Sequence, residues 1–257
     1  MPFKLGKNAV RRSMFTPSFG DFLPKASEWP VVGPRGWEYA VPAGALEMLG
    51  NDLWGNCVIA AIMHFIQTET ANVGAPLHGT LAQTLALYAA ITGFDINAGP
   101  SGNNPTDQGT DWLTALQYWK KNGVEVTDAQ GKTVIHKIIG YAALDITSVA
   151  QMRYASDIFG GLQFGIQCPQ SALQDDSNWI YVPNSPIDGG HGINNTGQGG
   201  AGGHIQSWGK DIPYQWQFML NYLDEAYAVV SPFWLNLQGK APSALDLNGL
   251  LTAFKTL

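Results

Sequence analysis

The stretch LGNDLWGNCVIAAIMH, residues 49–64, places one of only two cysteines of the chain between a polar loop and an apolar run. Gly55 and Asn56 supply a turn, and the nearly continuous apolar residues 58–66 then predict a helix. Cys57 is therefore expected in the first helical turn, where free backbone N–H groups and the helix dipole favour an anion. A thiolate is such an anion, so the position suits a nucleophile. The competing interpretation is a small buried side chain in an apolar helix.

Composition limits the class of protein. The chain has 257 residues, of which 45% are hydrophobic, so it can bury a sizeable core in one or two domains. Only 13% are charged, which leaves a surface of amides, hydroxyls and glycines that suits a crowded assembly or a polar binding surface. The net charge of −6 argues against a nucleic-acid partner, because no basic stripe is present to neutralise phosphates.

Membrane and export features are not evident in the sequence. It contains no run of about 18 apolar residues, which argues against a membrane partner. The segment 1–15 lacks the apolar block of a signal peptide. Two cysteines 111 residues apart do not form a disulfide framework. A cytoplasmic or virion-associated location is thus expected rather than a secreted one.

The chain divides into an arm and a domain. Residues 1–40 are rich in proline, glycine and aromatic residues and show no period, which predicts an extended N-terminal arm. The arm is too apolar to float freely, so it should lie along the domain or a neighbouring subunit, as in a homo-oligomer or larger assembly. Residues 41–257 are expected to form the domain. Its parts are a helical lobe at about 41–130, a β-rich lobe at about 131–235 and a C-terminal tail at 236–257.

Helical patterns precede strand patterns. Helices are predicted at 57–71, 80–92 and 110–122, the last capped by Gly109 or Thr110, with a further short helix at 148–160. Alternation predicts strands at 133–146 and 161–168, and 189–209 reads as two strands joined by a glycine-rich turn. The segment 214–230 is predicted to be the last main helix. This order indicates an α+β arrangement of two lobes, with an antiparallel sheet in the second.

A cysteine nucleophile needs a base, and five histidines are available. His64 lies two turns along the helix from Cys57, about 10 Å away, and cannot take the thiol proton. His78 and His136 have unremarkable surroundings. His191 follows two glycines and lies 134 residues after Cys57, within the roughly 130–150 residues expected between nucleophile and base in papain-type enzymes.

Several short motifs occur in order along the chain. They are GNC at 55–57, DQGT at 107–110, GIQCP at 165–169, GGH at 189–191 and HIQSWGK at 204–210. In this order and spacing the chain resembles a papain-like cysteine peptidase of the divergent bacterial or phage type, over about residues 45–235. The resemblance implies an α+β fold in which a helical N-terminal lobe carries the cysteine helix. A β-rich C-terminal lobe would carry the histidine.

The resemblance also implies roles for individual residues. Cys57 would be the nucleophile and His191 its base. Gln206 stands in the place of the family's asparagine, which orients the imidazole, and Trp208 would shield that hydrogen bond from water. Asn51 stands in the place of the family's glutamine, whose amide joins the Cys57 backbone N–H in the oxyanion hole. Asn51 is one methylene shorter than glutamine, and Gln206 is one methylene longer than asparagine.

Other residues near these motifs have expected structural roles. Asp52 is expected to cap a turn or to orient the cysteine loop, and Asp107 to close the loop before the third helix. Cys168 is expected to be buried. His204 shares a strand face with Gln206, but the pair of His191 and His204 lacks a third ligand, so no metal or other cofactor is expected.

The strand after the histidine departs from the family's apolar pattern, because it reads GINNTG at 192–197. An interior strand with Asn194, Asn195 and Thr196 would need every amide paired. We therefore expect either that this strand lies at a wet edge or that this part of the fold has drifted.

Three functions remain open at this stage. The first is a thiol hydrolase that cleaves a peptide or amide bond of a peptide or protein substrate through an acyl-enzyme. The second is a catalytically impaired papain-like fold that serves as a structural or adaptor protein, for example in a phage particle. The third is a non-proteolytic thiol enzyme, such as an amidase or transferase acting on cell-wall peptides.

Overall fold

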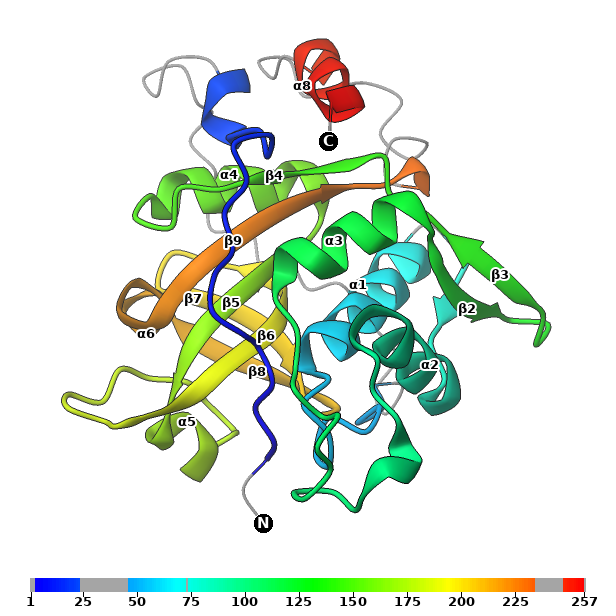
Figure 1. Ribbon diagram of the computed structural model, residues 1–257. Helices are drawn as coiled ribbons and strands as arrows, with labels where there is room; N and C mark the ends of the chain where they lie inside the picture. The colour runs from blue at the N-terminus through cyan, green and yellow to red at the C-terminus, as the bar shows by residue number, and fades with distance from the viewer. Residues whose placement is uncertain (1–2, 24–45, 73, 234–246, 257) are drawn as a thin grey trace.

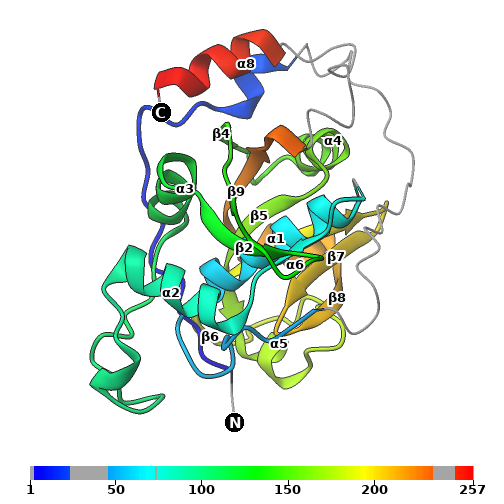
Figure 2. The ribbon, with the colours of Figure 1, turned by 90° about the vertical axis from the view of Figure 1, so that its right-hand side faces the viewer.

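A helical lobe and a sheet lobe pack against each other along helix α1 (Cys57–Asn72). The structure is a computed structural model that describes residues 3–23, 46–72, 74–233 and 247–256. Figure 2 shows α1 with α2 and α3 to its left and β7 and β8 to its right, and α1 packs against β6 and β7 of the large sheet. Because α1 meets protein on all sides, thirteen of its sixteen residues are buried, and its sequence is apolar almost all round rather than along one stripe.

The helical lobe combines three helices with a small sheet. The helices are α1, α2 (Leu81–Thr92) and α3 (Trp112–Lys121), with a 3₁₀ turn η3 (Ile96–Ala98) in the loop between the last two. Thr80 begins α2 through a capping box with Gln83, and Asp111 begins α3 by accepting the Thr114 N–H. The strands β1 (Leu77–His78), β2 (Val124–Asp128) and β3 (Thr133–His136) form an antiparallel sheet in that order.

The sheet lobe is a six-stranded antiparallel sheet of order β4-β9-β5-β6-β7-β8. Its strands are β4 (Gly140–Ala143), β5 (Leu162–Pro169), β6 (Ile187–Gln198), β7 (Gly202–Ser207), β8 (Lys210–Gln215) and β9 (Leu223–Val230). The helices α4 (Val149–Phe159), α5 (Gln170–Gln174) and α6 (Trp216–Tyr222) accompany it. The helix α8 (Leu247–Ala253) and the turn η4 (Phe254–Thr256) lie beside the turn η1 (Phe19–Phe22) at one end of the molecule (Figure 1).

Each lobe has its own hydrophobic core. One core gathers α1, α2, α3 and β2 around Trp112, Trp119 and Tyr88. The other gathers the large sheet and α4 to α6 around Phe164, Trp179 and Trp208. Full burial of a large apolar side chain contributes roughly 1.5–3 kcal/mol, so both lobes are held mainly by these residues.

Most predicted elements are confirmed, and two are wrong. The predicted α+β class is right, and α1, α2, α4, β5 and the β6–β7 hairpin lie where the sequence placed them. The third helix begins at Trp112 because Asp111, not Gly109 or Thr110, caps it. The predicted strand at 133–146 is two strands, β3 and β4, which belong to different sheets.

The predicted helix over 214–230 is the larger error. Only Trp216–Tyr222 is helical, and Leu223–Val230 is strand β9. This strand lies between β4 and β5 and is buried on both faces. Its apolar run therefore lacks the alternation that marks a half-exposed strand and looks like a buried helix.

Of the two expectations for the strand after the histidine, the wet edge is wrong. Strand β6 is interior, between β5 and β7, and Asn194, Asn195 and Thr196 are buried. The Asn194 amide donates to Gln206 and accepts from Gln163, and the Asn195 amide donates to the hydroxyl of Tyr214. Paired amides thus replace the apolar contacts of an ordinary interior strand.

The N-terminal segment lies against the domain. Residues 3–23 run across β9, β5 and β6 (Figure 1) and bury Phe19 completely, while residues 24–40 of the predicted arm fall outside the described residues. Of the predicted tail at 236–257, only 247–256 is described. Among the described helices, none has both the length and the apolar character that crossing a membrane requires.

Candidate active site

Cys57 is the first residue of α1. The carbonyl of Asn56 accepts the N–H groups of Ile59 and Ala60, and the Asn56 side chain donates to the carbonyl of Leu49, so the loop before the helix is fixed at both ends. The backbone N–H groups of Val58, Gly192 and Gly6 all interact with the Cys57 sulfur, the one of Gly192 at 3.4 Å. Such a set of N–H groups stabilises negative charge on the sulfur.

Strand β6 brings His191 beside this helix start, because its neighbour Gly192 contacts both Cys57 and Val58. A Cβ on Gly192 would lie 2.8 Å from Val58 Cγ2 and 3.0 Å from Val58 Cα. Only glycine therefore allows β6 to approach α1 so closely. Gly192 was not among the predicted site residues.

Three side chains hold the imidazole of His191. Its Nε2 lies 2.7 Å from Ser207 Oγ, the Trp208 ring stacks on it with centroids 4.6 Å apart, and Trp179 meets it edge-on at 6.4 Å. The other nitrogen, Nδ1, is buried and has no hydrogen-bond partner within the described parts of the chain. It is the nitrogen that remains free to exchange a proton. Trp208 was predicted to shield the hydrogen bond that orients the imidazole; its ring stacks on the imidazole, and the shielding stays a prediction.

The residue that contacts the imidazole is Ser207, not Gln206. Successive residues of a strand point to opposite faces, and the side chain of Gln206 points to the face that meets α1. There its Oε1 accepts from Thr68 Oγ1 at 2.9 Å and from Asn194 Nδ2 at 3.0 Å. Gln206 therefore links α1 to the sheet, and the side chain hydrogen-bonded to the imidazole is that of Ser207.

The loop residues before the cysteine behave differently from one another. Asn51 is buried six residues before Cys57, and its side-chain oxygen has no partner among the described residues, so its oxyanion role stays a prediction. Asp52 is exposed, and no hydrogen bond of its carboxylate occurs within the described residues, which argues against the expected orienting role. Asp107 holds the loop instead, since its Oδ1 accepts the Gly55 N–H at 2.9 Å and the Tyr88 hydroxyl at 2.8 Å.

The N-terminal residues 3–8 occupy the space between the two lobes at this site. The Lys7 N–H donates to the carbonyl of Gly190 in the sheet lobe at 3.0 Å. On the helical side, Thr110 donates to the carbonyl of Gly6 and accepts the N–H of Asn8, each at 2.9 Å. The segment is thus hydrogen-bonded to both lobes, as an extended peptide held in a cleft would be.

Side chains fix the same segment. Phe3 stacks on Trp208 with ring centroids 4.3 Å apart, so Trp208 lies between Phe3 and His191. The ammonium of Lys4 lies 2.8 Å from Asp107 Oδ2.

Glycines line the path of the segment. A Cβ on Gly109 would lie 2.0 Å from the Gly6 oxygen, and one on Gly190 would lie 2.1 Å from the Lys7 oxygen. Glycine at these two positions therefore allows the backbone of residues 6 and 7 to approach closely.

Burial sets the protonation states of the pair. Cys57 and His191 are both fully buried. Burial raises the pKa of the Cys57 thiol, against the lowering effect of the N–H groups of Gly192, Gly6 and Val58. Burial, and then the positive charge of Lys7, lowers the pKa of His191 to about 3. At neutral pH both groups are uncharged in this state.

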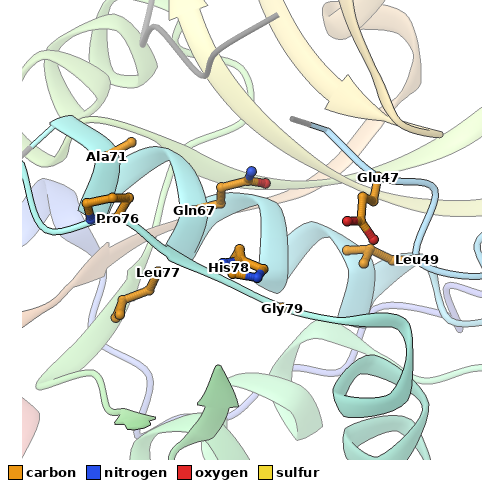
Figure 3. Close-up of a pocket in the computed structure, with 8 residues that line it drawn as sticks. All are labelled: Glu47, Leu49, Gln67, Ala71, Pro76, Leu77, His78 and Gly79. Carbon is orange, nitrogen blue, oxygen red and sulfur yellow. The ribbon is translucent and has the colours of Figure 1, made fainter. Parts of the chain in front are cut away.

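The remaining candidates lie elsewhere. His204 pairs with Asp211 near the surface, and Cys168 is a buried free thiol whose pKa is raised by burial. Within the described residues, no group of three or more His, Cys, Asp or Glu side chains is placed to hold a metal ion. A separate cavity of about 300 Å³, shown in Figure 3, lies beside α1 between Glu47 and His78 and contains none of the predicted site residues.

Comparison with solved structures identifies the fold as papain-like. Xylellain, a cysteine protease from Xylella fastidiosa, superposes with a TM-score of 0.66 at 11% identity, covering 90% of this chain and 97% of its own. Procathepsin B S9 from Trypanosoma congolense gives 0.58 at 10% identity, covering 88% and 86%. The digestive procathepsin L 3 of Tenebrio molitor larval midgut gives 0.56 at 13%, covering 84% and 76%. No family model and no curated protein matches the chain by sequence.

Proposed function

We propose that this chain is a papain-like thiol hydrolase that cleaves peptide or amide bonds through an acyl-enzyme on Cys57. The proposal rests on the contact between the start of α1 and strand β6. There the Cys57 sulfur faces three backbone N–H groups, and β6 places His191, with its Nδ1 free, next to Gly192. A nucleophile, a base and an orienting group for the base, Ser207, are the parts that thiol catalysis needs.

The chemistry follows from these parts. His191 Nδ1 takes the thiol proton, and the thiolate attacks the carbonyl carbon of the scissile bond. The Cys57 backbone N–H and the Asn51 amide would stabilise the oxyanion. The imidazolium, held by Ser207, then protonates the leaving amine, and water hydrolyses the thioester in a second, similar cycle.

The segment 3–8 keeps the enzyme latent in the state described here. At the sulfur it contributes the backbone N–H of Gly6, which is a hydrogen-bond donor and not an electrophile. Both reacting groups are fully buried in this state, and the charge of Lys7 adds to the lowering of the pKa of His191. Activity therefore requires that residues 3–8 leave the cleft.

Alkylation and hydrolysis test the proposal in the full-length chain. In a Lys7→Ala variant, which loosens the segment, we expect Cys57 to react with iodoacetamide at least about tenfold faster than in the wild type, with rapid reaction below pH 6. Adding His191→Ala should abolish the low-pH reaction. Peptide mapping by mass spectrometry separates Cys57 from Cys168, which serves as the internal control.

Turnover is measured on a fluorogenic peptide library, with Lys7→Ala/Cys57→Ala as the control for contaminating proteases. Hydrolysis that disappears in the Cys57→Ala control supports the proposal. Hydrolysis at the same rate in both proteins, or none in either, contradicts it.

The non-catalytic alternative has one observation in its favour, namely that Cys57 and His191 are both inaccessible. A scaffold protein, for example in a particle assembly, would keep residues 3–8 permanently in place. The same alkylation experiment distinguishes the two functions, because a scaffold predicts a Cys57 that is inert or titrates as an ordinary thiol near 8.5 even in Lys7→Ala.

A further inference from the structure

The side chain of Lys7 is fully buried, which is unusual for lysine. Its ammonium lies 3.0 Å from Asp224 Oδ2 and 3.1 Å from Glu225 Oε1, and 3.2 Å from the carbonyl of Asn8. The contacts with Asp224 and Asn8 are hydrogen bonds, and the contact with Glu225 is an ion pair.

A glycine opens the path that this side chain takes. Gly165 of β5 pairs with Glu225 of β9, and a Cβ at Gly165 would lie 2.2 Å from Lys7 Cε. It would also lie 2.6 Å from Glu225 Cγ. Any side chain at position 165 would therefore close the channel through which the lysine reaches the two carboxylates.

The two carboxylates are themselves held in place. The Tyr227 hydroxyl donates to Glu225 Oε2 at 3.0 Å, and the Gln167 amide donates to Asp224 Oδ2. The close passage beside Gly165 and the two carboxylates beyond it suit a linear alkylammonium better than the broad, planar guanidinium of arginine.

We propose that Gly165, Asp224 and Glu225 form a specificity site for a lysine side chain of the peptide substrate, and that Lys7 occupies this site in the latent state. The inference rests on the proposed hydrolase function and names its substrate class, an extended peptide with lysine at the residue that pairs with Gly190.

The free-energy cost of leaving Asp224 and Glu225 without an ammonium supports their assignment as a lysine site. The backbone hydrogen bonds between residues 6–8 and the cleft carry no side-chain information, so any peptide can make them. If Lys7 leaves, Glu225, almost completely buried, and Asp224 lose their counter-ion. Removing one partner of a buried ion pair is strongly unfavourable. A peptide that brings its own ammonium therefore displaces the segment far more readily than a neutral one.

The first experiment probes the site without requiring turnover. In full-length Lys7→Ala, n-butylammonium chloride should raise the thermal unfolding midpoint in a saturable manner, whereas n-butanol with sodium chloride should not. The rise should vanish in Lys7→Ala/Asp224→Asn/Glu225→Gln. Lys210→Ala is the matched control, because Lys210 pairs with Asp176 at the surface and leaves no cavity. An equal rise in all three proteins overturns the proposal.

A second variant covers the case in which Lys7→Ala does not fold. Lys7→Met keeps the volume but removes the charge, so it should unfold at a lower temperature than the wild type. Combining it with Asp224→Asn/Glu225→Gln should restore the midpoint. A Lys7→Met protein as stable as the wild type overturns the proposal.

The second experiment measures the preference of the enzyme for lysine in the peptide substrate. Fluorogenic tetrapeptides carrying lysine, arginine or norleucine at one position at a time are hydrolysed by Lys7→Ala. At one position kcat/KM should be at least about tenfold higher for lysine than for norleucine, and arginine should lie between them. The Asp224→Asn/Glu225→Gln substitutions should abolish the preference.

The outcomes separate the two proposals. Hydrolysis without a lysine preference overturns the specificity site and leaves the hydrolase intact. Butylammonium binding without hydrolysis contradicts the hydrolase function, yet leaves the ammonium site established.

Discussion

Trp208 has a left-handed backbone, with φ of 51°, followed by Gly209 with φ of 68°. The two residues form the tight turn between β7 and β8, a turn that requires positive φ at both positions. For a bulky residue this conformation costs of order 1 kcal/mol. Stacking against both His191 and Phe3 offsets the cost and fixes the indole over the imidazole. The turn also directs the preceding residue, Ser207, at His191 Nε2.

The choice between Gln206 and Ser207 shows what spacing along a sequence can predict. The motif HIQSWGK at 204–210, which follows His191 in the chain, correctly marked strand β7. It could not say which of two adjacent residues faces the histidine, because a shift of one residue reverses the faces of a strand. The side-chain partners of Gln206, which are Thr68 and Asn194, belong to distant elements and leave no pattern in the local sequence.

We therefore expect Ser207→Ala and Gln206→Leu to differ in kind. In the Lys7→Ala background, Ser207→Ala removes a hydrogen bond from the imidazolium and should raise the apparent pKa of Cys57, read from alkylation, by about one unit. Gln206→Leu should leave that pH profile unchanged. It should lower the unfolding free energy by about 1–3 kcal/mol, because Thr68 and Asn194 lose their acceptor in the interior. The reverse pattern would reinstate Gln206 as the orienting residue.

At the scale of elements, a ladder of amides joins the strands that carry the site. Gln163 of β5, Asn194 of β6 and Gln206 of β7 are register partners, and their side chains are hydrogen-bonded in series, ending at Thr68 of α1. All four residues are buried. The ladder therefore connects α1, which carries Cys57, with β6, which carries His191.

Asn194→Leu tests this ladder. The substitution leaves the Gln163 amide without its acceptor and the Gln206 oxygen with one donor fewer, so we expect a loss of about 2–4 kcal/mol in unfolding free energy by urea denaturation. Replacing Gln163, Asn194 and Gln206 together with Leu, and Thr68 with Val, removes every unpaired group and should recover most of that loss. A single variant as stable as the wild type would show that the ladder contributes nothing.

The sequence could predict those elements whose spacing of apolar residues and end signals are set by residues close in the chain. Helices α2 and α3 begin at the capping residues Thr80 and Asp111, and α1, α2 and α3 were all placed within about two residues. Strand β9 was missed because burial on both faces erases alternation, and the polar residues of β6 were misplaced because their partners lie on other strands. In both cases the deciding contacts are tertiary.

At the scale of the whole molecule, the sequence predicted that the N-terminal segment is anchored but not where it lies. Its apolar residues predicted that it would be anchored, and Phe3, Leu5 and Phe19 do pack against the sheet lobe. That residues 3–8 enter the cleft depends on glycines at positions 55, 109, 165 and 190, which are far apart in the chain. Lys4 and Lys7 of this segment pair with carboxylates of both lobes, Asp107 on one side and Asp224 with Glu225 on the other.

Two buried histidines should make the stability of the whole molecule depend on pH. His64 Nε2 donates to the carbonyl of Glu47, and burial lowers the pKa of His64 to about 4, while that of His191 is about 3. Both are neutral when folded but take up protons below pH 6.5 when unfolded. Their contribution to stability is therefore fully present above pH 6.5 and is lost as the pH falls toward 4. The expected loss is about 1.4 kcal/mol per pH unit for each histidine.

His64→Gln isolates this contribution from other titrating groups such as Glu225, whose pKa burial raises and whose effect has the opposite sign. The glutamine amide can still donate to the Glu47 carbonyl but cannot titrate. From urea denaturation at pH 7 and pH 5, the wild type should lose about 2 kcal/mol more than His64→Gln over this interval. His204→Gln is the control, since His204 is partly exposed and pairs with Asp211. Equal losses in the wild type and His64→Gln would mean that His64 is protonated in the folded state, and the charge would then have to be accommodated beside α1 at the centre of the fold.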